Sequence, residues 1–477
     1  MIYERGILMK LYINGEWVGE NLEQVDITNP ANGEVVDQVP KGGTEEAKSA
    51  ADAAAEAFKT WSKLSTYERS EKLELWHQYI EEHTEELATL MTKEQGKAIK
   101  ESRGEIGYAN SFIKWYAEEG KRNYGETIPA STDDKRLFAI KQPVGVVAAI
   151  TPWNFPAAMI TRKIAPALAV GCTAVIKPAS QTPLTALKLA ELAEKAGIPA
   201  GVVNVVVGSS SDISKVWQED QRVRKLTFTG STEVGKTLMK DSAETMKKIS
   251  LELGGHAPVI VFKDADLDRA VEDTIASKFR NGGQTCVCAN RIYVEESIAD
   301  EFTNKMKAEV EKLTVGDGLD EHTDIGPLVD QDAVDKVLSH IADAKEKGAT
   351  VVTGGTNTEG LFMEPTVLAN VTDDMACMIE ETFGPVAPIT TFKQEEEAIE
   401  RANDTIFGLA AYVFTKDINQ AIRVTEALEY GIVGLNDGGP SAAQAPFGGF
   451  KQSGIGREGG RQGMDEYLET KYVSFKM

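Results

Sequence analysis

The sequence predicts an α/β protein built on a doubly wound parallel sheet, followed by a second α/β domain. From Val144 onward, short β-branched runs such as VGVVAAI, TAVIKP, VVNVVVG and KLTFTGS alternate with helix-like segments such as TPLTALKLAELAEKAG. This alternation is typical of parallel strands joined by crossover helices, and such sheets bind ligands beyond the carboxyl ends of their strands. A second alternating set begins near APVIVFKDADLDRAV, after Gly254 and Gly255, and continues to about residue 440.

Further helices and a strand are expected in the first half of the chain. KLYINGEW predicts a short strand near the N-terminus. Apolar residues recur at helical spacing from Thr44 to about Ser102, so we expect helices with Thr44 as N-cap that only cover the outside of a domain. Another helix is expected with Thr182 as N-cap, Pro183 at its first position and Gly197 just beyond its end.

Two further segments, DDKRLFAIKQPV near residue 135 and the closing EYLETKYVSFKM, have the pattern of strands without a local partner. Isolated strands are poor structures alone, so we expect these strands to pair across subunits. They predict a small strand-rich oligomerisation arm over residues 121–142 and 460–477, and a homodimer or homotetramer.

Composition and charge exclude several classes of protein. The chain has 477 residues, 42% of them hydrophobic, and a net charge of −23, so it can bury a large core and is not expected to bind nucleic acid. Four cysteines without a CxxC pair and five scattered histidines predict a reducing compartment and no metal site. The sequence has no apparent signal peptide and no apolar run of ~20 residues, which predicts a cytoplasmic protein without a membrane partner. The start codon can be that of Met1 or that of Met9.

The segment FRNGGQTCVCANR, residues 279 to 291, raises the question of a reactive thiol. Cys286 follows Gly-Gly-Gln-Thr, and glycines offer no side chains for tight packing, which favours a reactive cysteine. A buried, inert cysteine remains the alternative. Thioester chemistry would also need an oxyanion donor, a base for a water molecule and an acceptor for whatever leaves.

Candidates for these helpers lie elsewhere in the chain. Asn154, in TPWNFP, has an amide donor at the carboxyl end of a predicted strand, although an asparagine there can also be a simple turn residue. Glu252, in SLELGGHAP, precedes two glycines, and its alternative is a surface glutamate at a strand end. GSTEVG, from Gly230 to Gly235, follows a strand and opens a helix, so it can receive a phosphate or be only a structural turn.

In combination, these segments resemble the aldehyde dehydrogenase superfamily. TPWNFP, GCTAVIKPAS, FTGSTEVG, LELGGHAP, GQTC, EETFGPV and PFGGFKQSGIGREGG occur in the family's order, and the resemblance extends from about residue 13 to the end of the chain. It implies the family's fold, with a Rossmann-like cofactor-binding domain over residues 1–120 and 143–252, an α/β catalytic domain over residues 253–445, and the strand-rich arm.

The resemblance also implies the roles of individual residues. Cys286 matches the nucleophile that forms a thiohemiacetal with the aldehyde, while its backbone N–H and Asn154 match the oxyanion donors. Glu252 matches the base that activates water to hydrolyse the thioester, and its surroundings can raise its pKa by desolvation. The residues implied to bind the nicotinamide cofactor are Trp153, Lys177, Ser180, Gly230, Ser231, Glu381 and Phe383.

The cofactor preference is predicted from Ser180. NAD-preferring relatives commonly have a glutamate at this position, where a carboxylate binds the ribose 2′-hydroxyl and would repel a 2′-phosphate. A small hydroxyl beside Lys177 removes that repulsion. We therefore expect the protein to use NADP, with NAD as a second cofactor.

Within the family, the chain looks most like succinate-semialdehyde dehydrogenases, and GQTCVCANR is the sharpest resemblance. Arg162, Arg280 and Ser441 match positions that hold the distal carboxylate in that subfamily, and guanidinium groups near a thiol suit a small anionic aldehyde. The alternative is that both arginines pair with acidic neighbours. The expected activity is oxidation of succinate semialdehyde to succinate; the alternatives are another carboxylated aldehyde, such as glutarate semialdehyde, or a non-catalytic protein on this fold.

The second cysteine of the segment, Cys288, is by resemblance a redox partner of Cys286. A disulfide between the two residues would block attack by Cys286 reversibly. The two residues are close in sequence, in a glycine-rich loop, so their sulfurs could meet only with considerable strain.

Overall fold

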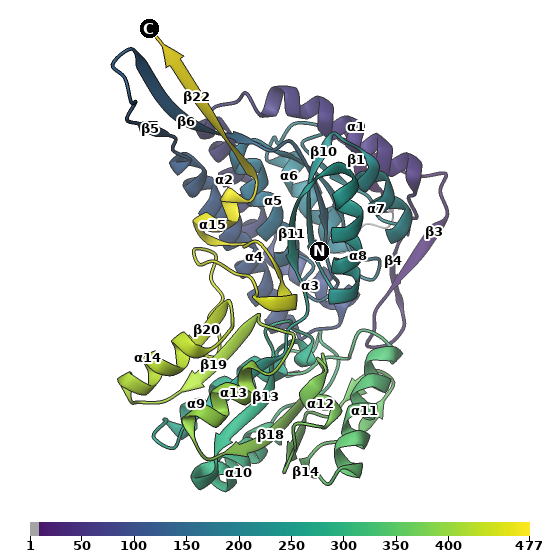
Figure 1. The fold of residues 1–477 in the computed structure, drawn as a ribbon. Coiled ribbons are helices and arrows are strands. Elements are labelled where there is room, and N and C mark those ends of the chain that lie inside the picture. The colour runs from purple at the N-terminus through teal and green to yellow at the C-terminus, as the bar shows by residue number, and fades with distance from the viewer. Residues whose placement is uncertain (1–8) are drawn as a thin grey trace.

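The computed structural model describes residues 9–477, which form two lobes and a projecting arm (Figure 1). The first lobe, in the upper part of Figure 1, contains an eight-stranded sheet, and the second lobe below it contains a seven-stranded sheet. Residues 1–8 lie outside the described part of the chain. The predictions about a signal peptide and a start at Met1 concern these residues and therefore also lie outside it.

The sheet of the first lobe is doubly wound. Its strands are β1 (Leu11–Ile13), β2 (Glu16–Val18), β7 (Val146–Ile150), β8 (Thr173–Lys177), β9 (Val203–Val205), β10 (Val223–Thr229), β11 (Lys248–Glu252) and β21 (Gly454–Ile455). They lie in the order β2-β1-β9-β8-β7-β10-β11-β21, and the strands from β9 to β11 are parallel. The strand order reverses between β7 and β10, which is where such sheets bind ligands. The predicted fold class is confirmed for this lobe.

Helices pack around this sheet and extend beyond it. They are α1 (Thr44–Trp61), α2 (Thr66–Glu82), α3 (Thr84–Gln95), α4 (Ile99–Glu119), α5 (Ala158–Val170), α6 (Leu184–Lys195), α7 (Ser210–Glu219) and α8 (Thr232–Ser242). The helices in the predicted range are α1, α2, α3 and the first turn of α4, and α4 continues well beyond that range to Glu119. Its side chains Phe112 and Ile113 are fully buried, and it packs on α2, α3 and α5.

Both predicted N-caps are wrong by one residue. The N-cap of α1 is Gly43 rather than Thr44, and its N–H donates to the carboxylate of Glu46 at 2.8 Å. The N-cap of α6 is Pro183 rather than Thr182, so the helix begins at Leu184. Its first N–H groups have a tertiary acceptor instead: the buried carboxylate of Glu94 accepts those of Leu184 at 2.7 Å and Thr185 at 2.9 Å. Gly197 follows the helix with a positive φ of 75°, as expected.

The second lobe is the predicted second α/β unit. Its sheet consists of β12 (Ala257–Val261), β13 (Ala289–Glu295), β14 (Thr350–Thr353), β17 (Thr366–Ala369), β18 (Val386–Phe392), β19 (Ala410–Phe414) and β20 (Ile432–Leu435), in the order β14-β17-β18-β13-β12-β19-β20. Along β12, Val259 and Val261 face one apolar cluster and Ile260 faces another, so both faces of the sheet are buried. Its helices and hairpin are α9 (Leu267–Phe279), α10 (Ala299–Val310), α11 (Gln331–Glu346), α12 (Ala376–Ile379), α13 (Glu395–Asn403), α14 (Ile418–Ala427), β15 (Asn357–Glu359) and β16 (Phe362–Met363).

The arm is a three-stranded sheet made within one chain. It consists of β5 (Glu126–Ile128), β6 (Lys135–Pro143) and β22 (Leu468–Lys476), and it projects from the first lobe (Figure 1). β22 pairs with β6 along its whole length, from Leu468 opposite Pro143 to Lys476 opposite Lys135. The prediction that these strands have no partner in their own chain is therefore wrong, because the C-terminal segment, preceded by α15 (Gly460–Asp465), returns to the first lobe. A separate hairpin, β3 (Gln24–Thr28) and β4 (Val35–Pro40), lies at the side of the molecule.

Candidate active site

Two adjacent glycines lie in the link between the two sheets, at the point where the predicted catalytic residues meet. Glu252 is the last residue of β11 in the first sheet, and the second sheet begins with β12 at Ala257. A Cβ atom on Gly255 would lie 2.1 Å from the carbonyl oxygen of Cys286, so the loop of Cys286 can approach this link only because residue 255 is a glycine. This contact brings Cys286 close to the segment that begins with Glu252.

Cys286 is the most accessible of the four cysteine residues. It is half-buried, whereas Cys172, Cys288 and Cys377 are buried. Burial raises the pKa of the Cys286 thiol to about 12, and the positive charge of Arg162 acts in the opposite direction. The thiol of the free protein is therefore neutral near neutral pH and becomes a strong nucleophile when it loses its proton.

Glu252 has the properties of a buried base. Its side chain is almost fully enclosed, and its Oε2 atom contacts no hydrogen-bond donor within residues 9–477. Burial, followed by the negative charge of Glu458, raises the pKa of Glu252 well above its usual value. A carboxylate with a raised pKa takes a proton from water more readily than an ordinary glutamate does.

Asn154 lies beside the Cys286 loop, in the segment that follows β7. Its buried Nδ2 atom donates to the backbone carbonyl of Gln284 at 2.9 Å, two residues before Cys286. The amide nitrogen has two hydrogens, so one hydrogen remains for another acceptor. This geometry is compatible with the predicted role of Asn154 as an oxyanion donor.

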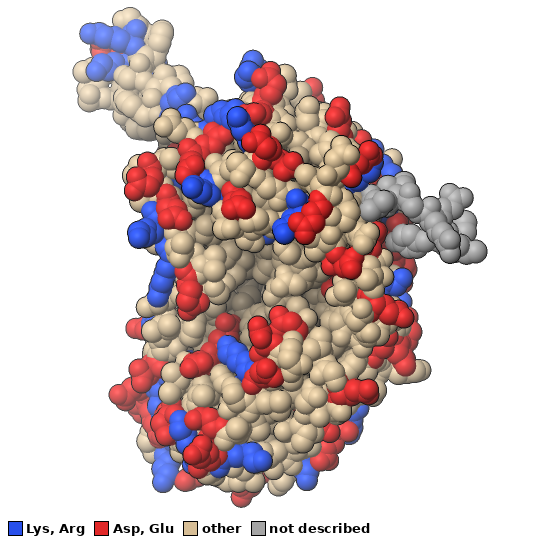
Figure 2. All heavy atoms as spheres, turned by 90° about the vertical axis from the view of Figure 1, so that its right-hand side faces the viewer, with Lys and Arg blue, Asp and Glu red and all other residues tan. Residues whose placement is uncertain are grey.

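A groove of about 1230 Å³ opens at the switch point of the first sheet. Five of the residues predicted to bind the cofactor line it: Trp153, Lys177, Ser180, Gly230 and Ser231. Gly230 and Ser231 form the turn before α8, whose N-terminus favours an anionic group. The face of the molecule that lies on the right-hand side of Figure 1 is hollowed between the two lobes (Figure 2). A sheet-end groove with a helix N-terminus at its base fits a dinucleotide.

Lys177 has an unusual environment in this groove. Burial lowers the pKa of Lys177 to about 8, and its Nζ donates to the backbone carbonyl of Pro178 at 3.1 Å. It forms no ion pair with any carboxylate of the described chain. A cofactor hydroxyl or phosphate oxygen would therefore supply the acceptors that this ammonium group lacks.

Glu381 and Phe383 approach the groove from the second lobe. The Phe383 ring lies edge-on to the ring of Trp153, with 5.8 Å between the ring centres. Glu381 accepts the N–H of Gly255 at 3.0 Å, and burial raises the pKa of Glu381 to about 7. Five of the predicted cofactor residues therefore line the groove. Phe383 contacts one of them, and Glu381 binds the link between the two sheets.

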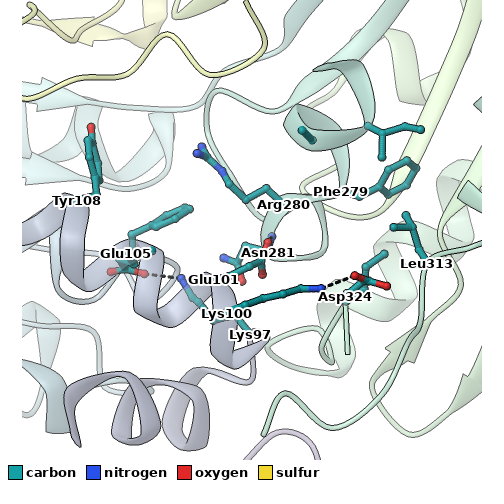
Figure 3. A pocket seen from close by; sticks show the side chains of 15 residues that line it. Lys97, Lys100, Glu101, Glu105, Tyr108, Phe279, Arg280, Asn281, Leu313 and Asp324 are labelled. Carbon is teal, nitrogen blue, oxygen red and sulfur yellow. Dashed lines mark hydrogen bonds and ion pairs between the residues drawn. The ribbon is translucent and has the colours of Figure 1, made fainter. Parts of the chain in front are cut away.

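A second cavity, of about 480 Å³, lies between α4 and the turn η3 (Arg280–Gly283) (Figure 3). The exposed guanidinium of Arg280 lies 5.5 Å from the centre of the Phe155 ring and forms no ion pair with the residues that the structure describes. Tyr108 lines the same cavity, and its hydroxyl points to the same side as the Arg280 guanidinium (Figure 3). This guanidinium is available to an anionic ligand.

Arg162 differs from Arg280 because it already has a carboxylate partner. Its Nε atom binds the carboxylate of Glu458, and its buried guanidinium lies 4.0 Å from the centre of the Phe447 ring. Pairing with an acidic neighbour was the alternative to a substrate role. Within the part of the chain that the structure describes, it applies to Arg162 and not to Arg280. Ser441 is half-buried in the loop after β20, and neither Ser441 nor Arg162 lines the Arg280 cavity. The structure does not gather the three predicted carboxylate ligands around that cavity.

Cys286 and Cys288 are both free thiols in the structure. Cys288 is fully buried, and its Sγ atom donates to the backbone carbonyl of Lys278 at 3.3 Å. Formation of a disulfide would break this contact. The redox switch stays a prediction.

Sequence reasoning missed several residues of the site. Glu458 binds both Arg162 and Lys163, and its position inside the PFGGFKQSGIGREGG motif was the available signal. Lys97 and Glu105 form a buried ion pair of 2.5 Å near Asn154. Lys97 lies in the region predicted to be peripheral and Glu105 lies just beyond it, so no signal in the sequence pointed to them.

Within residues 9–477, no cluster of three or more His, Cys, Asp and Glu side chains could hold a metal ion. No helix of this part of the chain is both long and apolar enough to cross a membrane. The predictions of no metal site and no membrane partner remain predictions.

The sequence matches the aldehyde dehydrogenase family over residues 17–473. It is 58% identical to a succinate-semialdehyde dehydrogenase (NADP(+)) of Escherichia coli, covering 97% of this chain and 96% of that protein. It is 57% identical to a glutarate-semialdehyde dehydrogenase of Pseudomonas putida, with coverage of 97% and 96%. A solved structure of a succinate-semialdehyde dehydrogenase from Burkholderia pseudomallei matches with a TM-score of 0.98 at 51% identity, covering 100% of each chain. The chain belongs to the aldehyde dehydrogenase family, which confirms the predicted family and fold.

The raised pKa of Cys286 gives a testable pH dependence. Because the thiolate is the reactive form, alkylation of Cys286 by iodoacetamide should accelerate about tenfold per pH unit from about pH 7 to about pH 10. The rate is measured by peptide mass spectrometry on the protein without nucleotide. The buried Cys172 serves as an internal control that should not react in the folded protein. A plateau reached near neutral pH would contradict the raised pKa.

Proposed function

We propose that the protein oxidises succinate semialdehyde to succinate with NADP or NAD. The observation that supports the substrate most directly is the guanidinium of Arg280, which lines a cavity and pairs with no carboxylate of residues 9–477. Arg280 belongs to the turn η3, which leads directly into the loop of Cys286. A carboxylate on the far end of a short aldehyde is a suitable partner for this guanidinium. The named activities of the Escherichia coli and Burkholderia pseudomallei relatives support the same substrate.

The first chemical step is attack by Cys286. The thiol first loses its proton to water. The thiolate sulfur then bonds to the aldehyde carbon while the carbonyl π bond breaks, and its electron pair moves to the oxygen, which becomes the oxyanion of a thiohemiacetal. The backbone N–H of Cys286 and the free amide hydrogen of Asn154 bind this oxygen, and such donors stabilise a charge that develops only in the transition state. NAD(P) bound in the groove would supply the hydride acceptor, and loss of the hydride from the same carbon leaves a thioester on Cys286.

The second step is hydrolysis of the thioester. Glu252 removes a proton from water, the oxygen bonds to the thioester carbon, and the bond to Cys286 breaks, which releases the carboxylate product. The raised pKa of Glu252 makes it a better proton acceptor, while the requirement for its ionised form means that hydrolysis accelerates as pH rises through that pKa.

The two steps can be separated with Glu252→Gln. This variant should still transfer one hydride per active site in a rapid burst, because Cys286 and Asn154 are intact. Its steady-state rate should fall by about 10²- to 10⁴-fold, because an amide cannot act as the base. Stopped-flow absorbance of the reduced nucleotide measures both phases. Glu346→Gln, at an exposed position of α11, is the matched control. A Glu252→Gln variant with an unchanged steady-state rate would show that another group is the base.

The role of Arg280 is tested by comparing aldehydes with and without a carboxylate. Arg280→Ala should lower kcat/KM for succinate semialdehyde by about 10- to 150-fold, the loss of roughly 1.5–3 kcal/mol from a charged hydrogen bond. The value for butanal, which has a methyl group instead of the carboxylate, should change little. Arg224→Ala, at an exposed arginine of the first lobe, is the control. Equal losses for both aldehydes would remove Arg280 from substrate recognition, and no activity of the parent enzyme with succinate semialdehyde would refute the proposed substrate.

A second candidate substrate is glutarate semialdehyde, which is longer by one methylene group. The relative from Pseudomonas putida that is 57% identical is named for this activity. One methylene group changes binding by only about 1–3 kcal/mol, so both aldehydes can be oxidised at different rates. The ratio of kcat/KM for the two aldehydes identifies the preferred one.

We further propose that NADP is the preferred cofactor and that NAD is also used. Ser180 lines the groove together with Lys177, and neither brings a negative charge to this position. The Escherichia coli relative is named for NADP(+).

Ser180→Glu should reverse this preference. The new carboxylate would repel a 2′-phosphate and accept a hydrogen bond from a 2′-hydroxyl, so the ratio of kcat/KM for NADP to that for NAD should fall by about 10- to 100-fold. Ser180→Gln, of similar size and without charge, is the control. Equal effects of both variants would show that size rather than charge decides the preference.

The domain roles and the assembly are also proposals. We assign cofactor binding to residues 1–120 and 143–252, catalysis to residues 253–445, and oligomerisation to residues 121–142 and 460–477. The projection of the three-stranded arm from the first lobe supports a role in a homodimer or homotetramer (Figure 1). A location in the cytoplasm remains a prediction of the sequence.

A further inference from the structure

A buried polar network surrounds the backbone carbonyl of Asn154. This group is distinct from the side-chain amide, which is the proposed oxyanion donor. This carbonyl accepts a hydrogen bond from Lys97 Nζ at 2.7 Å and another from Asn281 Nδ2 at 3.0 Å. Lys97 precedes α4 in the first lobe, whereas Asn281 lies in the turn η3 of the second lobe. Both side chains are almost fully buried, so water does not compete for these bonds.

The Lys97 arm of the network continues into α4. Lys97 Nζ also binds Glu105 Oε2 at 2.5 Å, as Figure 3 shows, and lies 4.1 Å from the centre of the Phe155 ring. The other carboxylate oxygen of Glu105 accepts the N–H groups of Ala157 at 2.9 Å and Ala158 at 3.2 Å, where α5 begins. The backbone is therefore held at Asn154 and again immediately after it.

The Asn281 arm reaches the loop of the nucleophile. Asn281 Nδ2 also donates to the carbonyl of Gln284 at 3.3 Å, and this carbonyl accepts the side-chain amide of Asn154 at 2.9 Å. The side-chain oxygen of Asn281 accepts Gln95 Nε2 at 3.0 Å, and its backbone N–H donates to Glu101 at 2.8 Å. These bonds close a ring of contacts around Asn154 and the residues just before Cys286.

We propose that Asn281, together with the Lys97–Glu105 pair, is a positioning residue that fixes the side-chain amide of Asn154 relative to Cys286. The inference deepens the proposed function, since it rests on Asn154 as an oxyanion donor. Lys97, Glu105 and Asn281 also line the Arg280 cavity. Their proposed role is exerted through Asn154 and not through contact with the reacting atoms. They act by restricting the backbone of Asn154 from one side and the Gln284 carbonyl from the other.

The energetic reason is the precision that an oxyanion donor requires. A misplacement of about 1 Å can cost on the order of 10²-fold in rate, and the loss of one donor costs about 10²- to 10³-fold. Asn154 lies in a segment without regular secondary structure after β7, and Cys286 lies in a second such segment that belongs to the other lobe. Neither sheet alone determines the distance between them, so contacts between the two segments must do so.

The experiment compares two reactions of the same thiol. Addition to an aldehyde creates an oxyanion, whereas alkylation by iodoacetamide displaces iodide and creates none. Asn281 has a positive φ of 52°, which glycine adopts freely, so Asn281→Gly removes the side chain while the turn can persist. In this variant the burst rate of nucleotide reduction should fall about 10- to 100-fold, while the alkylation rate of Cys286 stays within about twofold.

Two further variants complete the test. Asn370→Gly is the matched control, because Asn370 also has a positive φ, of 56°. Its side chain donates a hydrogen bond to the exposed Thr350 at 3.2 Å. Both residues lie at the β14–β17 edge of the second sheet, away from the candidate active site. Asn281→Asp keeps the size and the acceptor for Gln95 but removes the donors to Asn154 and Gln284, so it should show the same selective loss. It decides the question if Asn281→Gly does not fold.

The proposal is overturned if both reactions slow in parallel, which indicates general damage, or if the burst rate is unchanged in both Asn281 variants. The proposed function is judged separately, on the unmodified enzyme. If that enzyme oxidises butanal but not succinate semialdehyde, the substrate is wrong and the comparison is made with butanal. If it reduces neither nucleotide with either aldehyde, the role of Asn154 falls and this inference falls with it.

Discussion

The close approach of the Cys286 loop to the glycine link between the two sheets is the contact on which the site depends. The carbonyl of Cys286 occupies the space that a side chain on residue 255 would need. The same glycine donates its N–H to Glu381. One backbone position therefore lies against the proposed nucleophile, Cys286, and also binds Glu381, a predicted cofactor ligand. A larger residue there would displace Cys286 from the end of β11, where Glu252 lies.

Charge is distributed unevenly over this site. The chain has a net charge of −23, and acidic side chains are spread over the face shown in Figure 2, so an anionic aldehyde and an anionic cofactor both approach a repulsive surface. Local groups offset this repulsion: Arg280, which has no acidic partner among the described residues, Lys177 in the groove, and the N-terminus of α8. Arg162 is different, because Glu458 neutralises its charge inside the protein.

Glu458 links two features of the site that lie on different elements. Its carboxylate binds Arg162 and Lys163, both fully buried on α5, and a buried cation without such a partner is strongly destabilising. Its negative charge also raises the pKa of Glu252. The residue that stabilises the buried cations therefore also keeps the proposed base able to accept a proton.

The sequence by itself determined the alternation of strands and helices, the doubly wound sheet, the family, and five of the residues that line the groove at the switch point, because these follow from local patterns and ordered motifs. Only the tertiary structure decided the partners of individual groups: Glu94 in place of Thr182 at the start of α6, Glu458 beside Arg162, β22 alongside β6, and Lys97 and Asn281 on the Asn154 carbonyl. A local pattern records which face of an element is apolar and where it begins. Hydrogen bonds and ion pairs between residues that are far apart in the chain depend on how the whole chain packs, and no short window of sequence contains that information.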